Sequence, residues 1–136
     1  MKLILCVEDR GGMTFNKRRV SRDKKLIEDL AELVGNDAVY IEPYSEALFS
    51  EVSVNLVLSA SPMESADEGD YAFIERFDPA PCLDKAEAII LYKWNRRYPF
   101  ELALSFSPCD KGFRLDSTSE FKGNAHDKIT REVYVK

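Results

Sequence analysis

Residues 1–35, MKLILCVEDRGGMTFNKRRVSRDKKLIEDLAELVG, contain the pattern that decides the fold. Residues 3–7 form a short, continuous apolar run, which is typical of a strand that is buried on both faces. After a glycine-containing loop, apolar residues recur at the spacing of one helical face, at Leu26, Ile27, Leu30, Leu33 and Val34. Ser21 is a suitable N-cap and Gly35 a suitable C-terminal residue for a helix over residues 22–34. A buried strand followed by an amphipathic helix indicates an α/β fold.

The rest of the chain adds short apolar runs that predict further strands. These lie at residues 38–41, 54–58, 71–74, 88–92 and 100–106, with short helices at 44–49 and 83–86 and loops at 13–16 and 59–70. The 88–92 and 100–106 runs form a possible hairpin. The last two predicted strands, 113–122 and 128–135, flank a turn and form an antiparallel pair. We therefore expect a single domain over residues 1–136, with a mixed, mainly parallel central sheet that is flanked by helices and ends in an antiparallel hairpin.

The composition excludes several classes of protein. The chain has 136 residues, of which 45% are hydrophobic, and its formal net charge is −5, so disorder and a wholly nucleic-acid-binding surface are both unfavourable. The three cysteines are widely spaced and there is one histidine, which argues against a disulfide framework and against a zinc site. The chain has no apolar run long enough to span a membrane and no signal-peptide core, so we expect a cytoplasmic protein.

The order of these elements resembles that of the dihydrofolate reductase family. Residues 2–7 look like the family's first strand, residues 11–16 like its active-site loop, and residues 21–34 like its first helix. The sequence Asn-Leu-Val-Leu-Ser at residues 55–59 is similar to the family's Asn-Ile-x-Leu-Ser strand, and residues 119–121 and 129–135 resemble its final antiparallel pair. The resemblance implies that Asp23 stands for the acidic residue that holds the substrate. A helix-dipole role in the first helical turn is the simpler interpretation of Asp23.

The sequence departs from the family pattern at the positions where the resemblance implies binding of the cofactor and of folate. Glu42-Pro43-Tyr44-Ser45 stands where the resemblance implies a Gly-Arg-x-Thr turn for the cofactor phosphate; a carboxylate repels a phosphate, and proline has no backbone donor. No Gly-Gly pair follows the strand at 88–92, and the arginine for the folate tail falls near Val52 or Ser53. We therefore expect no cofactor, NADPH in particular, and a reductase fold without a reductase site.

A basic segment precedes and enters the predicted helix. Residues 17–25 hold six basic residues and one acidic residue, a local net charge of +5. Our candidates for binding phosphate or a nucleic acid are Lys17, Arg18, Arg19 and Arg22. The alternative is that these side chains are simply solvated. RNA is a possible partner, and an unknown small molecule or protein is another.

Two weak catalytic candidates complete the set, Asp23 and His126. His126 with Asp127 could act as a general-base pair, although a surface histidine in a polar turn is the favoured interpretation. Glu8 and Asp9 form a poor magnesium site, because adjacent acids at a strand end point in different directions, and no metal is expected. The leading hypothesis is a non-catalytic protein that binds a ligand or partner. The alternatives are an RNA- or nucleotide-acting enzyme that uses residues 17–25, and a reductase with an altered cofactor site.

Overall fold

A seven-stranded sheet forms the centre of the computed structural model, which describes residues 1–136. The first five strands in the spatial order are parallel to one another. The sixth strand pairs antiparallel with the fifth, and the seventh pairs antiparallel with the sixth. This arrangement confirms the predicted mixed sheet with its C-terminal antiparallel pair. In spatial order the strands are β5 (Asn55–Leu58), β4 (Ala38–Ile41), β6 (Tyr71–Phe73), β1 (Lys2–Val7), β7 (Ala88–Lys93), β10 (Ile129–Val135) and β9 (Arg114–Phe121).

A second, small sheet corrects two predictions. It contains β2 (Gly12–Phe15), β3 (Arg18–Arg19) and β8 (Leu102–Ala103), in the order β3-β2-β8. Residues 13–16 therefore form a hairpin with β3 instead of a loop, and the turn residues Asn16 and Lys17 have φ values of 51° and 63°. Positive φ at both turn positions gives the twist that a two-residue hairpin requires. The expected pairing of residues 100–106 with 88–92 is wrong, because β1 and β10 already occupy both edges of β7.

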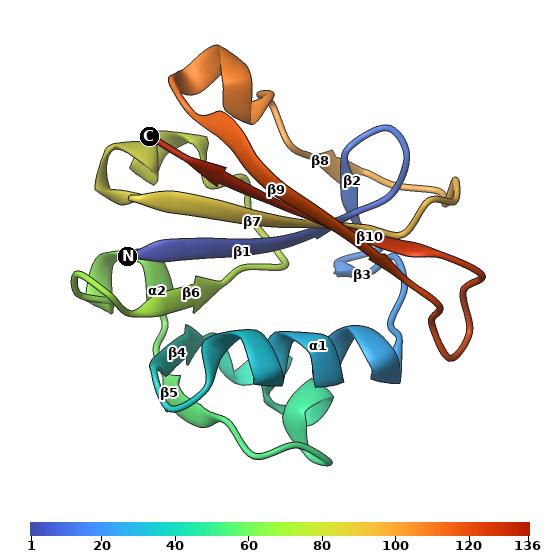
Figure 1. The fold of residues 1–136 in the computed structure, drawn as a ribbon, viewed down its shortest axis with the longest axis horizontal. Coiled ribbons are helices and arrows are strands. Elements are labelled where there is room, and N and C mark those ends of the chain that lie inside the picture. Colours follow the sequence, from blue (N-terminus) through green and yellow to red (C-terminus); the bar gives the residue numbers. More distant parts are fainter.

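The helix α1 (Lys24–Val34) lies along one face of the sheet (Figure 1). Its N-cap is Asp23, not Ser21 as predicted, and the Asp23 side chain accepts a hydrogen bond from Lys25 N at 2.9 Å. Gly35 ends the helix as predicted, with a φ of 57° that favours glycine. The shorter helices are η1 (Pro43–Phe49), α2 (Pro62–Ser65), which lies in the segment predicted to be a loop, η2 (Ala80–Lys85) and η3 (Pro108–Lys111).

The hydrophobic core has two parts, one on each face of the sheet. On the first face, the buried side of α1 packs against Ile4, Phe73, Tyr92 and Ile129. The second face is covered by α2, η2 and the loops around them, which contribute Met63, Ala66 and Leu83. Polar contacts fix α1 on its face, because Asp29 accepts hydrogen bonds from Tyr92 Oη at 2.6 Å and from Arg131 Nη1 at 2.7 Å.

The position of the β9–β10 turn matters most for the site. This turn extends past the N-terminal end of α1 (Figure 1), so it meets the residues that precede the helix. None of the helices is long and apolar enough to cross a membrane.

Candidate functional site

A small cavity lies at the carboxyl ends of β1 and β6, under the start of α1. Ligands of open α/β sheets commonly bind at this edge. The cavity volume is about 20 Å³, which is room for about one water molecule. Side chains from six segments close it: Cys6, Met13, Arg19, Val20, Ser21, Arg22, Asp23, Leu26, Ile27, Leu48, Phe73, Ile74, Glu75 and Trp94. The interior of the cleft therefore has no space for a heterocyclic ligand.

Asp23 has a fully occupied carboxylate. Besides Lys25 N, it accepts hydrogen bonds from Asn124 N at 2.8 Å, Ala125 N at 2.7 Å and His126 Nδ1 at 2.8 Å. The residue is 4% exposed. Burial raises the pKa of this carboxyl, but the hydrogen bonds from Asn124, His126, Ala125 and Lys25 outweigh it and hold the pKa below its ordinary value. Asp23 is thus ionised, and it is more than the helix-dipole partner that the sequence favoured.

Gly123 lets the β9–β10 turn approach the aspartate this closely. A Cβ atom at this position would lie 2.6 Å from Asp23 Oδ2 and 2.9 Å from Ile129 Cδ1. Real Cβ atoms do not approach other atoms so closely, so the contact between turn and carboxylate requires a glycine here.

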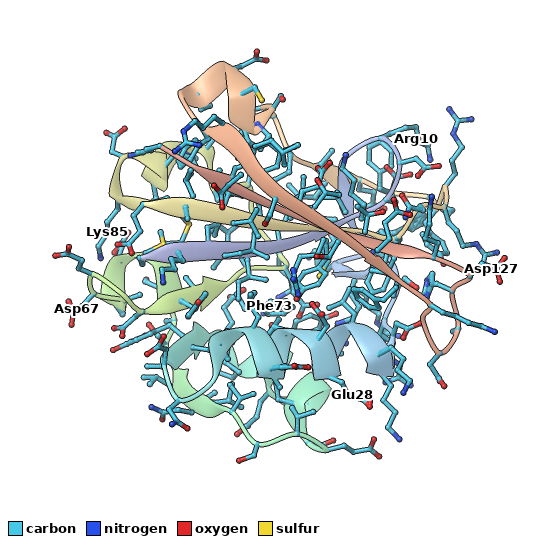
Figure 2. All side chains as sticks on the ribbon, viewed as in Figure 1. Arg10, Glu28, Asp67, Phe73, Lys85 and Asp127 are labelled. Carbon is cyan, nitrogen blue, oxygen red and sulfur yellow. The ribbon has the colours of Figure 1, made fainter.

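His126 is buried, which corrects the prediction of a surface histidine. It is 4% exposed and its ring stacks on Trp94 at a centroid distance of 4.7 Å. Its acidic partner is Asp23 and not Asp127, which is exposed at the outer edge of the turn (Figure 2). On the other side of the ring, His126 Nε2 lies 2.9 Å from Ser21 Oγ and 2.8 Å from Tyr98 Oη.

The structure thus joins the two weak catalytic candidates, which are 103 residues apart. Ser21, which the sequence suggested only as a helix cap, and Tyr98 belong to the same hydrogen-bonded cluster. No local pattern could have linked these residues. Gly123 was the only signal in the sequence that the turn makes a close contact.

A second buried acid, Glu75, also lines the cavity and holds Arg19. Arg19 Nε donates to Glu75 Oε1 at 2.7 Å and Nη2 donates to Oε2 at 3.0 Å, a bidentate pair. Ser45 Oγ donates to the same carboxylate at 2.6 Å. The Tyr44 ring lies between two guanidinium groups, with Arg19 at 4.4 Å and Arg76 at 4.2 Å from its centroid. The charge of Arg19 is therefore already matched inside the protein.

The other three basic candidates differ from Arg19. Lys17, Arg18 and Arg22 are exposed and form no ion pair with an acidic residue. Lys17 and Arg18 extend from the β2–β3 hairpin, and Arg22 lies just before α1. The segment thus offers three cations to an external anion.

An open groove continues outward from the closed cavity. It has a volume of about 490 Å³, which is within the usual range of small-molecule sites. Its lining combines apolar and charged side chains: Arg22, Asp23, Lys24, Ile27, Glu28, Ala47, Leu48, Ser50, Glu51, Val52, Asn124 and Ala125. Lys24 Nζ forms an ion pair with Glu51 at 2.8 Å, whereas Arg22 is free.

Glu8, the first half of the magnesium pair that the sequence disfavoured, has a structural role. Its carboxylate accepts hydrogen bonds from Arg10 N at 2.6 Å, Gly12 N at 2.9 Å and Tyr98 N at 3.3 Å. These bonds connect the loop after β1 to the segment that carries Tyr98. No cluster of three or more potential metal ligands occurs in the chain.

Comparison with known proteins identifies the architecture. A dihydrofolate reductase from Enterococcus faecalis, solved in complex with NADP(H) and RAB-propyl, matches 98% of this chain and 94% of its own, with a TM-score of 0.66 and 9% sequence identity. The chain has a dihydrofolate reductase-like fold. No family profile matches the sequence, and no curated protein matches it. At 9% identity the likeness establishes the fold, so ligand and reaction have to be argued from this chain's own residues.

The residues at the positions where the resemblance implies a dinucleotide site do not suit that ligand. Glu42, where the resemblance implies a Gly-Arg-x-Thr turn, places its carboxylate 3.7 Å from Arg76 Nη2. A cofactor phosphate at this point would meet an anion that already neutralises the nearby cation, and Pro43 offers no N–H. Val52, near the expected position of the tail-binding arginine, lies in the outer groove and has no charge.

Proposed function

We propose that this dihydrofolate reductase-like protein binds a small anion with an apolar body in its outer groove and does not reduce a folate. The observation that carries the proposal is the contrast between the closed cavity of about 20 Å³ and the open groove of about 490 Å³ beside it. A ligand that cannot enter the cleft can still lie across its mouth.

The chemistry of the groove supports an anionic ligand. Ile27, Leu48 and Val52 supply apolar surface for the body of the ligand. Arg22 is the unpaired cation on the groove, and its guanidinium fits a carboxylate or a phosphate with two hydrogen bonds. Asp23 does not repel the ligand strongly, because its carboxylate faces four donors of the protein itself.

Binding of 8-anilinonaphthalene-1-sulfonate, an aromatic molecule with one negative charge, tests the proposal by fluorescence titration. We expect saturable binding to one site and a loss of about fivefold in affinity for Arg22→Gln, since an exposed ion pair contributes up to about 1 kcal/mol. Arg97→Gln is the matched control, because Arg97 is also exposed and unpaired but lies outside the groove. The uncharged analogue N-phenyl-1-naphthylamine should bind both variants equally. Equal effects of the two substitutions on the anionic probe would overturn the proposal.

A second candidate function, binding of single-stranded RNA, is favoured by one observation. Lys17, Arg18 and Arg22 lie within a stretch of six residues, and all three are exposed and form no ion pair with an acidic residue. A cluster of this kind neutralises phosphates, and RNA affinity would then fall steeply with salt. The third candidate, a reductase with an altered cofactor site, has the least support, because the carboxylate of Asp23 is saturated and the cleft is filled.

A further inference from the structure

Ser21, His126 and Asp23 form a chain of hydrogen bonds in the order of nucleophile, base and acid. Ser21 Oγ lies 2.9 Å from His126 Nε2, and His126 Nδ1 lies 2.8 Å from Asp23 Oδ2. Both distances are within the range that a general base needs to take the proton of a serine. The arrangement is recognised by geometry and not by sequence order, so its occurrence in an unusual fold is no objection.

The acid and the base are held rigidly. Asp23 is ionised and fixed by three backbone N–H groups, so it accepts a hydrogen bond from the Nδ1–H of His126, which keeps that proton on Nδ1 and leaves the Nε2 lone pair directed toward Ser21. Stacking on Trp94 fixes the plane of the imidazole ring. Asp23 is a positioning residue in this arrangement, whereas His126 and Ser21 exchange the proton.

The serine is the accessible member of the three. Ser21 is half-buried, whereas Asp23 and His126 are both buried. The backbone N–H of Arg22, which directly follows Ser21, forms no hydrogen bond within the protein. A free N–H on the residue after the nucleophile is a donor for a developing oxyanion in several hydrolases.

Space for a substrate is available next to the serine. The small cavity that Ser21 lines and the open outer groove share Arg22, Asp23, Ile27 and Leu48. A molecule that lies in the groove therefore reaches the mouth of the cavity, and the cavity itself has room for about one water molecule.

We propose that Ser21 is a nucleophile that cleaves carboxylic esters, with His126 as its general base. This inference rests on the proposed groove, because the acyl part of the ester would lie there. Ser21 Oγ adds to the ester carbonyl while its proton passes to His126 Nε2. The C–O bond to the alcohol then breaks, and His126 returns the proton to the departing oxygen. Water cleaves the acyl-serine by the same route, so the products are one acid and one alcohol.

Tyr98 has a defined place in this scheme. Its hydroxyl lies 2.8 Å from His126 Nε2 and 3.3 Å from Ser21 Oγ, so it competes with the serine for the single lone pair of the imidazole. Tyr98→Phe removes the competitor while keeping the ring. We expect the variant to hydrolyse esters at least as fast as the parent protein.

A fluorophosphonate probe tests the proposal on the unaltered protein. An activated serine displaces fluoride from the probe and forms a stable adduct, which peptide mass spectrometry locates. We expect the adduct on Ser21, and hydrolysis of p-nitrophenyl butyrate with a kcat/KM at least about 100-fold higher than that of Ser21→Ala. Ser59→Ala is the control, because Ser59 is also a half-buried serine, hydrogen-bonded to Ser65 at 2.8 Å outside the site.

The two proposals fail separately. If the probe does not label Ser21 and Ser21→Ala hydrolyses the ester as fast as the parent protein, the nucleophile is excluded. Binding of the anilinonaphthalene probe to Ser21→Ala would then still support the groove as a binding site. If neither protein binds that probe but Ser21 is labelled, the groove proposal is wrong and the serine is active without it.

Discussion

Two buried carboxylates, those of Glu75 and Asp23, line the same small cavity but have different partners. Glu75 is 8% exposed and faces the guanidinium of Arg19 in a bidentate pair. Asp23 is 4% exposed and faces three backbone N–H groups and a histidine. Glu75 is paired with a permanent positive charge, whereas Asp23 is paired with backbone dipoles and an imidazole ring.

The difference in partners separates a contact that only stabilises the fold from one that can also transfer a proton. An arginine keeps its proton in proteins, so the Arg19–Glu75 pair ties β3 to the end of β6 and can do no proton chemistry. Imidazole can accept and release a proton, so the Asp23–His126 pair is able to take part in proton transfer. The lining of one cavity therefore contains an ion pair with a structural role and a histidine that can act as a base, and the total charge of the region does not distinguish them.

Breaking the Arg19–Glu75 ion pair should have the largest effect on stability. Glu75→Gln leaves the mostly buried guanidinium of Arg19 without its counter-charge, and removal of one partner of a buried pair costs about 3 kcal/mol or more. Urea unfolding of the variant measures the loss. Replacing both partners, as in Arg19→Met with Glu75→Leu, should recover much of the lost stability. If Glu75→Gln is as stable as the parent protein, the ion pair is solvated and the prediction is wrong.

Separating the β9–β10 turn from Asp23 should have the next largest effect. Gly123→Ala places a methyl group within 2.6 Å of Asp23 Oδ2, so the turn has to move away and three hydrogen bonds weaken. Overpacking of this kind costs about 1–3 kcal/mol. Thermal unfolding measures the change. Asn124→Ala is the control, because it keeps the backbone donor and alters only an exposed side chain, and it should change stability by less than about 0.5 kcal/mol.

These contacts show how far the sequence could predict the molecule. The strand at residues 3–7 and the helix before Gly35 were predictable, because burial patterns within one element are local. The N-cap was not, since Ser21 and Asp23 are both good caps and distant donors from residues 124–126 favour the aspartate. The β2–β3 hairpin was missed because Asn16 and Lys17 take up positive φ without a glycine.

The site was less predictable than the fold. Asp23 and His126 were named separately, because no spacing rule relates residues on a helix start and a distant turn. Arg19 was grouped with Lys17, Arg18 and Arg22 because all four are neighbours in the sequence. Only the β-pairing of Arg19 with Thr14, which turns its side chain toward Glu75, separates it from the rest.

The depressed pKa of Asp23 predicts a loss of stability in acid. A carboxyl whose folded-state pKa lies below its unfolded value of about 3.9 stabilises the protein above that pH, and the contribution disappears as the pH falls through the folded-state pKa. We expect the urea midpoint of the parent protein to decrease from pH 5 toward pH 2. Asp23→Asn should start from a lower midpoint and decrease less steeply. Parallel curves for the two proteins would show that Asp23 titrates alike in both states.

The smallest expected effect concerns Lys17, Arg18 and Arg22, the exposed cations that form no ion pair within the protein. If single-stranded RNA binds the basic segment, the logarithm of its affinity should fall linearly with the logarithm of salt concentration, with a slope of about −0.7 for each phosphate contact. Arg18→Gln and Arg22→Gln should each flatten that slope by about one contact, because both side chains are exposed and unpaired. Fluorescence anisotropy with a labelled oligonucleotide measures the slope.

Lys85→Gln is the matched control for these variants, because Lys85 is also an exposed cation but lies at the opposite end of the molecule (Figure 2). A change in net charge alone would alter all three slopes equally. Flattening by Arg18→Gln and Arg22→Gln alone assigns the contact to the basic segment. Equal slopes for all variants would remove RNA as a partner of this segment, because a phosphate contact cannot be lost without releasing fewer counterions.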